Sequence, residues 1–444
     1  MQEQGECQPK QRSLGAWLAL LETRHPCEIE LGLERIAQVG ATLKLACPAK
    51  KVVSVAGTNG KGSTVAVMEA LLLRQGRRVG AYTSPHLLDY NERVRIDGQR
   101  VSDEALCEAF VLIDAACGEI SLSYFEFGTL AALLLFQQAD LDVALLEVGL
   151  GGRLDAVNIV DADVAVITSV ALDHESWLGE SREQIALEKA GIARSGKPLI
   201  YGDSDIPATL LPHVLELGAR PYLLGDSGFN YRCRNDALSL HCSDTNGELQ
   251  TYDKLPLPQV ALPSALCAVQ ALLLLDELNL DSAAVAQVFA KTSLPGRYQE
   301  LCFHNRNLFL DVAHNPAAAA LLATQLETLK SVKIHALFAV MADKDIAGIV
   351  AALYQHIAHW HLGELPHIAR AEQADDVATL LQSCQGRTSS VSTYADIKGA
   401  MVGALAAMQV EDLLLVFGSF FTVAEVLNLV QSGEALLDGE GSDE

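Results

Sequence analysis

The sequence predicts an α/β protein of two domains, each built around a mostly parallel sheet. Short apolar segments alternate with segments of helical spacing along most of the 444 residues. Several apolar segments are continuous, such as 142–148 and 164–170, which is typical of strands buried on both faces. The length predicts two or three domains. We place a linker at 294–299, between a first domain, 1–293, and a second domain, 300–432.

Composition and charge exclude several classes of protein. Hydrophobic residues make up 50% of the chain and charged residues 20%, which is ordinary for a folded soluble protein. A formal net charge of −24 argues against binding to nucleic acid or to an anionic membrane. No apolar run approaches the roughly 20 residues needed to span a bilayer. The ten cysteines include no C-x-x-C pair, and the start shows no secretory signal, so we expect reduced thiols and a cytoplasmic protein.

The first domain is predicted to alternate helices and strands, with one antiparallel insertion. Ser102 is a good N-cap for the helix that follows it, and Gly76 is a good C-cap for the helix that ends at Arg74. In order, we predict helices at 14–24 and 31–39, a strand at 52–56, a helix to 74, a strand at 79–83, a hairpin at 91–98, helices at 103–116 and 123–139, strands at 142–148 and 164–170, a helix at 182–193, antiparallel segments at 220–256, and helices at 263–278 and 282–292.

The second domain is predicted to be Rossmann-like, although it lacks a dinucleotide fingerprint. Gly418-Ser419-Phe420 does not continue into G-x-G-x-x-G. The acidic tail, 433–444, is expected to be disordered. Predicted strands at 307–312, 334–340, 364–369, 390–394 and 412–418 alternate with predicted helices at 316–330, 345–359, 373–384, 395–408 and 422–431.

The most informative stretch is the glycine-rich turn Gly57–Ser63, between a strand and a helix. Its glycines, Lys61 and the hydroxyl residues would cradle a phosphate at a helix N-terminus. The strict pattern G-x-x-x-x-G-K-[ST] does not fit, because Gly62 stands where the hydroxyl residue should be. An ordinary strand-to-helix turn is the alternative. We predict that the first domain is P-loop ATPase-like.

Further polar residues follow the ends of other predicted strands, where sites form in open parallel sheets. Glu147 ends an apolar strand, and a carboxylate there needs a partner or a hard cation such as Mg²⁺. Arg153 or backbone amides are the alternative partners. His174, after Asp173, is compatible with a metal ligand, an acid or base, or a hydrogen-bonded polar residue. By itself, Lys189 is typical of a surface lysine.

In the second domain, a strand-to-helix turn carries Asp311, His314 and Asn315 before Pro316. Asn315 suits an N-cap and Pro316 suits a first helical turn, so simple capping is one interpretation. Capping explains Asp311 and His314 less well, which favours a functional role for them.

An ordered set of segments makes the chain resemble the bacterial dihydrofolate synthase/folylpolyglutamate synthase family, relatives of the Mur ligases. The resemblance covers about 14–429 and is specific as a set. The segments are Gly57–Ser63, Ser84-Pro85-His86, Tyr124-Phe125-Glu126, Glu147–Asn158, Asp173-His174, Glu188-Lys189-Ala190-Gly191, Leu294-Pro295-Gly296-Arg297 and Asp311–Pro316.

This resemblance implies a role for each matching residue, and for Lys189 it implies a catalytic role in place of that of a surface lysine. The family's lysine is carboxylated by CO₂ and helps to bind a second Mg²⁺. Lys61, His174 and Lys189 would carry the catalysis. By the same resemblance, ATP would contact Thr58, Asn59, Gly60, Lys61, Ser264, Arg297 and Asp311; Mg²⁺ would contact Ser84, Glu147, His174 and Lys189; and dihydropteroate would contact Thr23, Arg24, His25, Pro26, Ser123, Tyr124, Phe125, Glu126, Leu154, Asp155 and Ala156.

The implied activity is an ATP-dependent ligase that adds L-glutamate to dihydropteroate and to the glutamate tail of reduced folates. The expected cofactors are two Mg²⁺ ions, with room for a monovalent cation, and we expect a monomer. One departure is Ser264, where the family usually has Asn near the nucleotide base; serine cannot reproduce the paired hydrogen bonds of an amide. The rival functions are a folylpolyglutamate-only ligase, a cell-wall Mur ligase, and a regulatory protein that hydrolyses ATP slowly.

Overall fold

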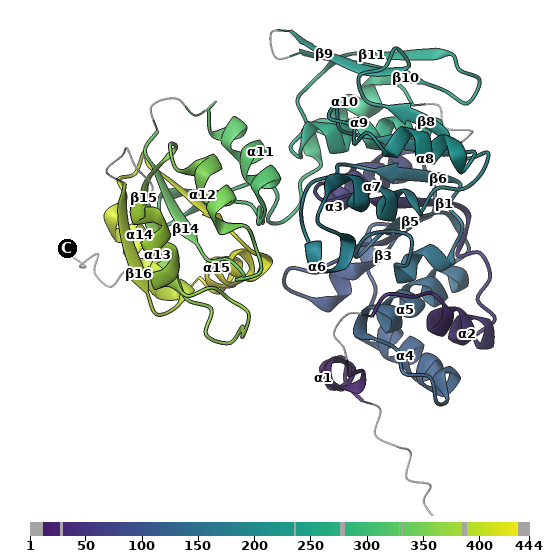
Figure 1. The fold of residues 1–444 in the computed structure, drawn as a ribbon, viewed down its shortest axis with the longest axis horizontal. Coiled ribbons are helices and arrows are strands. Elements are labelled where there is room, and N and C mark those ends of the chain that lie inside the picture. The colour runs from purple at the N-terminus through teal and green to yellow at the C-terminus, as the bar shows by residue number, and fades with distance from the viewer. Residues whose placement is uncertain are drawn as a thin grey trace, which may run out of the picture.

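The computed structural model describes residues 12–26, 30–234, 237–275, 280–327, 329, 332–383 and 389–433. Two α/β lobes lie side by side, and the chain crosses between them after α10 (Ser282–Lys291) and before β12 (Gln299–Phe303) (Figure 1). This arrangement confirms the predicted fold class. The predicted acidic tail beyond Gly433 and the polar start before Arg12 lie outside the described residues.

The first lobe contains an eight-stranded sheet in the order β4-β3-β2-β5-β1-β6-β7-β8. From β2 to β8 the neighbours are parallel, whereas β3 and β4 add an antiparallel edge. The carboxyl ends of the parallel strands therefore open at one edge of the sheet. The strands are β1 (Ala49–Ala56), β2 (Val79–Tyr82), β3 (Val94–Ile96), β4 (Gln99–Arg100), β5 (Leu141–Glu147), β6 (Val164–Ile167), β7 (Pro198–Tyr201) and β8 (Arg220–Leu223).

Helices cover both faces of this sheet, and one buried apolar cluster lies on each face. Ser102 caps α4 as predicted, since its hydroxyl accepts a 3.2 Å hydrogen bond from the Ala105 amide. One cluster includes α1 (Leu14–Arg24), α2 (Glu34–Thr42), α4 (Asp103–Cys117), α5 (Tyr124–Gln138), α6 (Glu175–Leu178), α7 (Arg182–Ala190) and α8 (Leu210–Glu216); the other includes α3 (Lys61–Arg74), α9 (Leu262–Leu273) and α10. Two short 3₁₀ helices are η1 (Tyr90–Arg93) and η2 (Ala156–Ile159).

The predicted antiparallel insertion at 220–256 is confirmed in its larger part and wrong at its start. A three-stranded antiparallel sheet forms from β9 (Phe229–Arg234), β10 (Ala237–Ser243) and β11 (Leu249–Leu255). It lies over α9 and α10, at the top of Figure 1. Residues 220–223, however, are β8, which pairs parallel with β7 and extends the main sheet. The neighbouring strand β7 was not predicted from the sequence either.

The second lobe has a six-stranded sheet in the order β12-β13-β17-β14-β15-β16. Only β12 is antiparallel to its neighbour, and the sequence analysis did not predict it. The remaining strands are β13 (Arg306–Leu310), β14 (Ile334–Phe338), β15 (Ile357–Gly363), β16 (Ser390–Tyr394) and β17 (Leu413–Phe417). On one face lie α11 (Pro316–Leu326), α12 (Ile346–Leu353) and α13 (Ala374–Ser383), and on the other α14 (Ile397–Ala407) and α15 (Phe420–Ser432).

Two predictions in the second lobe are wrong. The predicted helix at 345–359 ends at Leu353, and the strand placed at 364–369 is instead β15. The residues of β15 alternate between the two faces of the sheet: Trp360 and Leu362 pack under α12 and α13, while His361 lies on the other face. This period of two is a strand signal that the histidines obscured. Within the described part of the chain, none of the helices is long and apolar enough to cross a bilayer.

Candidate active site

The glycine-rich loop follows β1, an inner strand of the first sheet, and ends at the N-terminus of α3. Gly60 has φ +88°, and a Cβ atom there would lie 2.4 Å from the Ser264 hydroxyl oxygen, so only glycine fits without strain. The Thr58 hydroxyl donates to the Ala171 carbonyl at 3.2 Å and accepts from the Ala171 amide at 3.1 Å. Lys61 Nζ lies over the loop, 3.1 Å from the Gly57 carbonyl. The loop is thus held rigidly around a lysine.

Next to the loop lies a set of oxygen and nitrogen donors suited to a divalent cation. Glu147 ends β5 and is 4% exposed, and its carboxylate accepts a 3.1 Å hydrogen bond from the Ser84 amide. Burial raises the pKa of Glu147, while the Lys61 ammonium opposes the rise. His174 lies in the loop after β6, and burial lowers its pKa to about 4, so its imidazole is neutral at pH 7. A carboxylate, the Ser84 hydroxyl and a neutral imidazole can all bind a metal ion.

Lys189 is a buried lysine near the end of α7. It is 3% exposed, because α7 packs closely on the loop after β5: a Cβ atom on Gly152 would lie 2.9 Å from the Lys189 carbonyl oxygen. Burial and then the Lys61 charge lower its pKa to about 7. Among the described residues, no carboxylate lies within 4 Å of its ammonium nitrogen. A large share of this amine is therefore neutral, and nucleophilic, at physiological pH.

One residue of the linker between the lobes, Arg297, and one of the second lobe, Asp311, complete the enclosure. Arg297 is half-buried, with its guanidinium carbon 4.8 Å from the centre of the Phe420 ring. Asp311 is 8% exposed and accepts hydrogen bonds from the Ala313 amide at 2.8 Å and the Tyr298 amide at 3.1 Å. Burial raises the pKa of Asp311 and lowers that of Arg297, and each charge opposes the shift of the other.

One cavity of about 920 Å³ between the lobes brings these groups together. Every residue predicted to contact ATP or Mg²⁺ lines it, including those from the second lobe. The residues are Thr58, Asn59, Gly60, Lys61, Ser84, Glu147, His174, Lys189, Ser264, Arg297 and Asp311. The cavity therefore combines an anion-binding loop, donors for a hard cation and a reactive amine, which is a set suited to phosphoryl transfer.

A polar bridge connects the two lobes, and its role was not predicted from the sequence. Asp173 of the first lobe accepts from Lys344 Nζ at 2.6 Å and from the Asn315 side-chain amide at 3.2 Å. Asn315 also exchanges two 3.0 Å hydrogen bonds with Asn59 of the glycine-rich loop, while it caps α11. Burial acts to raise the pKa of Asp173, but the His314 hydrogen bond and the nearby positive charges outweigh burial and hold this pKa well below its usual range. Lys344 follows the carboxyl end of β14, a position at which the rule used for Glu147 would have found it.

The residues predicted to contact dihydropteroate do not line this cavity, and most of their polar groups have protein partners. Ser123 and Glu126 cap α5 reciprocally, and Glu126 also pairs with Arg35 at 3.0 Å. Of the remaining side chains, Thr23 donates to the Leu20 carbonyl, Arg24 pairs with Asp114, both nitrogens of His25 are bonded, and Asp155 accepts from the amides of Leu150 and Val157. Pro26 lies in a bend, Leu154 in a turn, and Ala156 begins η2.

Tyr124 and Phe125 connect this group to the cavity. Phe125 packs so closely on Gly149, which lines the cavity, that a Cβ atom there would lie 2.5 Å from its ring. Arg93, another lining residue, places its guanidinium carbon 5.6 Å from the centre of the Tyr124 ring. The two aromatic side chains thus contact residues that line the cavity, as does Asp155, which accepts from the amide of the lining residue Leu150.

Comparison with known proteins gives consistent matches along the chain. Residues 296–420 match the family described as Mur ligase, glutamate ligase domain. The dihydrofolate synthase/folylpolyglutamate synthase of Escherichia coli is 44% identical over 94% of this chain and 96% of its own length. The structure of E. coli FolC in complex with DHPP and ADP has a TM-score of 0.89 and 42% identity, and it covers 96% of this chain and 99% of that one. A bifunctional synthase structure with Mn, AMPPNP and L-glutamate bound has a TM-score of 0.86 and 44% identity, covering 95% and 98%.

Proposed function

This chain belongs to the dihydrofolate synthase/folylpolyglutamate synthase family, and from that premise we propose how its cavity carries out an ATP-dependent glutamate ligation. The enzyme is an amide-forming ligase that uses ATP and a divalent metal ion. The observation that carries the assignment of the site is the single cavity lined by every predicted nucleotide and metal residue. It supports a shared centre in which ATP lies between the lobes.

We assign the nucleotide to the glycine-rich loop and the second lobe. Thr58, Asn59, Gly60 and Lys61 hold the phosphates, because backbone amides at a helix N-terminus and a lysine favour anions. Arg297 and Asp311 reach the nucleotide from the other side. Ser264 lies against Gly60 and offers one hydroxyl toward the nucleotide base.

Ser84, Glu147 and His174 fit a Mg²⁺ ion by their chemistry, since they supply a hydroxyl, a buried carboxylate and a neutral imidazole to the lining of one cavity. A second Mg²⁺ requires a further anion, which a carboxylated Lys189 would provide. Bound Mg²⁺ supplies neutralisation of phosphate charge. For the expected monovalent cation, we propose no binding residue.

Carboxylation of Lys189 follows from its neutral amine. The nitrogen lone pair attacks the carbon of CO₂, a C–N bond forms, one C=O bond becomes a C–O⁻ group, and the nitrogen loses a proton to solvent. The product is a carbamate anion, which replaces a destabilising buried cation by a metal ligand. The burial of Lys189 and its pKa of about 7 support this assignment.

In the proposed reaction, a carboxylate oxygen of dihydropteroate, or of a folate glutamate tail, attacks the γ-phosphorus of ATP. The bond from that phosphorus to the bridging oxygen breaks, which gives an acyl phosphate and ADP. Lys61 stabilises the negative charge on the transferring group. The amine of L-glutamate then attacks the acyl carbon, phosphate leaves, and the amine loses a proton. Enclosure between the lobes excludes the water that would hydrolyse the acyl phosphate.

The pterin end of the substrate is proposed to lie against Tyr124 and Phe125, beyond Gly149. The remaining members of the predicted group shape this region through the hydrogen bonds described above. Reduced folates as substrates, a monomeric state and a cytoplasmic location also belong to the proposal. The free state of the seven described cysteines supports the last of these.

The test is an assay of the purified protein with ATP, Mg²⁺, L-glutamate and one acceptor at a time. We expect glutamate-dependent release of ADP and phosphate with dihydropteroate and also with tetrahydrofolate. Turnover with tetrahydrofolate but not with dihydropteroate would indicate a folylpolyglutamate-only ligase. Turnover with a UDP-sugar acid instead would favour a cell-wall Mur ligase, and ATP hydrolysis that ignores glutamate would favour a regulatory ATPase.

A further inference from the structure

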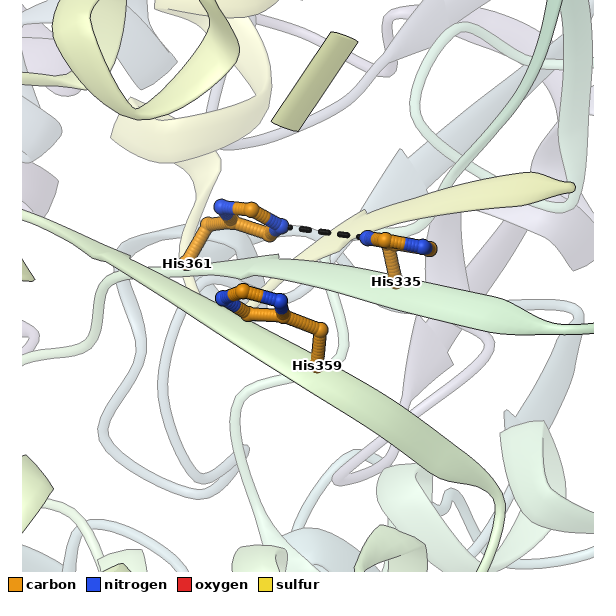
Figure 2. Close-up of side chains that lie close together, drawn as sticks. All are labelled: His335, His359 and His361. Carbon is orange, nitrogen blue, oxygen red and sulfur yellow. Dashed lines mark hydrogen bonds between the residues drawn. The ribbon is translucent and has the colours of Figure 1, made fainter. Parts of the chain in front are cut away.

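Three histidines converge in the second lobe, away from the active-site cavity. His335 comes from β14, and His359 and His361 come from the neighbouring strand β15, with His335 paired to His359 in the register (Figure 2). Each offers a nitrogen atom, and these atoms all lie within 4.8 Å of one another. The Nδ1 atom of His335 is 3.2 Å from Nε2 of His361. None of the three lines the active-site cavity.

The position of the cluster on the sheet separates it from the catalytic chemistry. Its members lie on the face covered by α14 and α15, where Leu337 and Leu414 are their neighbours on the strands. His335 is the second residue of β14 and faces Asp412, which directly precedes β17. The active-site residues follow the opposite, carboxyl ends of these strands. The reaction in the active-site cavity therefore does not explain why these three histidines lie together.

One nitrogen of each ring lies near a polar side chain outside the cluster, and the other nitrogen lies toward the space between the three rings. His361 Nδ1 lies 3.1 Å from the Tyr394 hydroxyl, which leaves Nε2. His359 Nε2 lies 3.0 Å from the Ser392 hydroxyl, which leaves Nδ1. His335 Nε2 lies 3.5 Å from a carboxylate oxygen of Asp412 but makes no aligned hydrogen bond. Metal-binding histidines commonly have such outer partners, which fix the tautomer and the ring orientation.

We propose that His335, His359 and His361 form a binding site for one divalent transition-metal ion of the zinc class, separate from the active site. Imidazole nitrogens suit Zn²⁺, Co²⁺, Ni²⁺ and Cu²⁺, whereas Mg²⁺ prefers oxygen. Three neutral imidazoles with an open fourth position are a known ligand set for zinc. Asp412 supplies a negative charge next to His335 that favours a cation at the centre.

The distances fit this assignment with a modest rearrangement. Zn–N bonds of about 2.0–2.1 Å place tetrahedral ligand atoms roughly 3.3–3.4 Å apart. The His335–His361 separation of 3.2 Å already matches. The rings of His359 and His361 are stacked, with centres 4.1 Å apart and planes within 8°, so His359 must rotate to direct its lone pair at the ion. It is the one partly exposed member, whereas the other two are fully buried, so it has the room to do so.

The protonation states agree with the geometry. Burial lowers the pKa of His335 to about 4 and that of His361 to about 3, and it also lowers the pKa of His359. The neighbouring charges act in both directions: Lys333 lowers the pKa of His335 and His359, while Asp412 raises that of His335. At pH 7 all three rings are neutral, which is the form that binds a metal.

The competing explanation is a set of neutral imidazoles that merely stack and share hydrogen bonds inside the sheet. The two explanations differ in one measurable respect, the binding of Co²⁺. We would titrate the full-length protein with Co²⁺ in excess Mg²⁺ and follow the visible absorption of the bound ion. The proposal predicts one equivalent with the intensity of a four-coordinate nitrogen site, competed away by Zn²⁺.

Variants then assign the site. His359→Gln changes the partly exposed member and is expected to weaken Co²⁺ binding at least tenfold, while His361→Phe keeps a stacked ring and is expected to abolish it. The controls are His367→Gln, a surface histidine with a side chain 58% exposed, and His174→Gln in the active site. Both controls should keep the Co²⁺ spectrum.

Thermal unfolding provides a second readout in case a variant is unstable. Zn²⁺ should raise the unfolding temperature of the wild type and of the two controls, but not that of His359→Gln, because a ligand stabilises only a fold that binds it. Absence of the Co²⁺ spectrum in the wild type would overturn the proposal. So would a spectrum that survives both cluster variants or disappears in His174→Gln.

Discussion

The two walls of the active-site cavity use buried lysines in opposite ways. Lys189 of the first lobe has no carboxylate within ion-pair distance among the described residues, and its pKa falls to about 7. Lys344 of the second lobe is almost as enclosed, with a side chain 9% exposed, yet it donates to Asp173 across the lobes at 2.6 Å. A buried ammonium without a partner tends to lose its proton, whereas one that is paired with a carboxylate keeps its charge, and removal of either partner is costly. The comparison separates reactive groups from groups that hold the lobes together.

The largest effect is expected for Lys189→Ala. Loss of the proposed carbamate removes a metal ligand and should lower the rate of glutamate ligation on the order of 10²–10³-fold, as for other groups that stabilise transition-state charge. Small carboxylates such as acetate, which can occupy the vacated space, should restore part of the rate. Steady-state kinetics with dihydropteroate measure both effects.

Lys197→Ala is the matched control, because this lysine of the same lobe is 46% exposed and pairs with Asp163. It should keep full activity. If Lys189→Ala kept it too, the carboxylation proposal would fail.

A smaller loss is expected for Lys344→Met, which leaves Asp173 without its ammonium partner. Breaking a buried pair is costly, and part of that cost would fall on closure of the lobes, so kcat/KM for ATP should fall about 10- to 100-fold. A double-mutant cycle with Asp173→Asn should show strong coupling.

The exposed Lys291 offers a control substitution, Lys291→Met, which should change nothing. Additive effects of Lys344→Met and Asp173→Asn would mean that the ion pair does not contribute to closure.

The pKa of Lys189 predicts how reactivation depends on pH. After a brief acid treatment, which removes CO₂ from a carbamate, activity should return when dissolved CO₂ is supplied at constant concentration. Because only the neutral amine reacts, and its pKa is lowered to about 7, the return rate should fall about tenfold per pH unit below 7 and level off above 8. A rate that continues to rise toward pH 10 would indicate an ordinary lysine.

The smallest effect is expected at the glycine-rich loop. Gly60→Ala forces a side chain against the Ser264 hydroxyl and places alanine at a positive φ, which costs roughly 1–2 kcal/mol in backbone strain alone. We expect the KM for ATP to rise several-fold, with partial recovery when Ser264→Ala is added.

Gly76→Ala separates strain from contact. Gly76 has φ +71° at the other end of the same helix, and a Cβ atom there meets nothing within 4 Å. The Gly76→Ala variant should have a lower free energy of unfolding than the wild type but an unchanged KM for ATP. An equal rise in KM in both variants would show that helix stability, and not the contact with Ser264, sets nucleotide binding.

The sequence predicted those parts of the fold and site that depend on local signals. The glycine-rich loop is recognisable by its cluster of glycines, and the end of β5 by a carboxylate after an apolar strand. Both line the same cavity. The strand at 357–363 was missed because histidines replace the aliphatic residues that usually mark the face of a strand. Register and face depend on neighbouring strands, which no short window contains.

The burial of Lys189 and the bridge to Lys344 depend on tertiary packing. Residues 182–190 look like a surface helix by themselves, and only the close contact between Gly152 and Lys189 removes the lysine from water. The partners Asp173 and Lys344 are far apart in the chain and in different lobes. Resemblance to a family indicated Lys189, whereas the only signal for Lys344 was its place after the predicted strand at 334–340, and that signal does not reveal its partner in the other lobe.

If the glycine-rich loop holds the nucleotide as proposed, the hydrogen bonds between Asn59 and Asn315 couple nucleotide binding to closure of the lobes. If closure strengthens the hold on phosphate by some factor, then phosphate must strengthen closure by the same factor. A saturating nucleotide would therefore mask a weakened bridge, and a substitution far from the phosphates would be measured as poorer nucleotide binding.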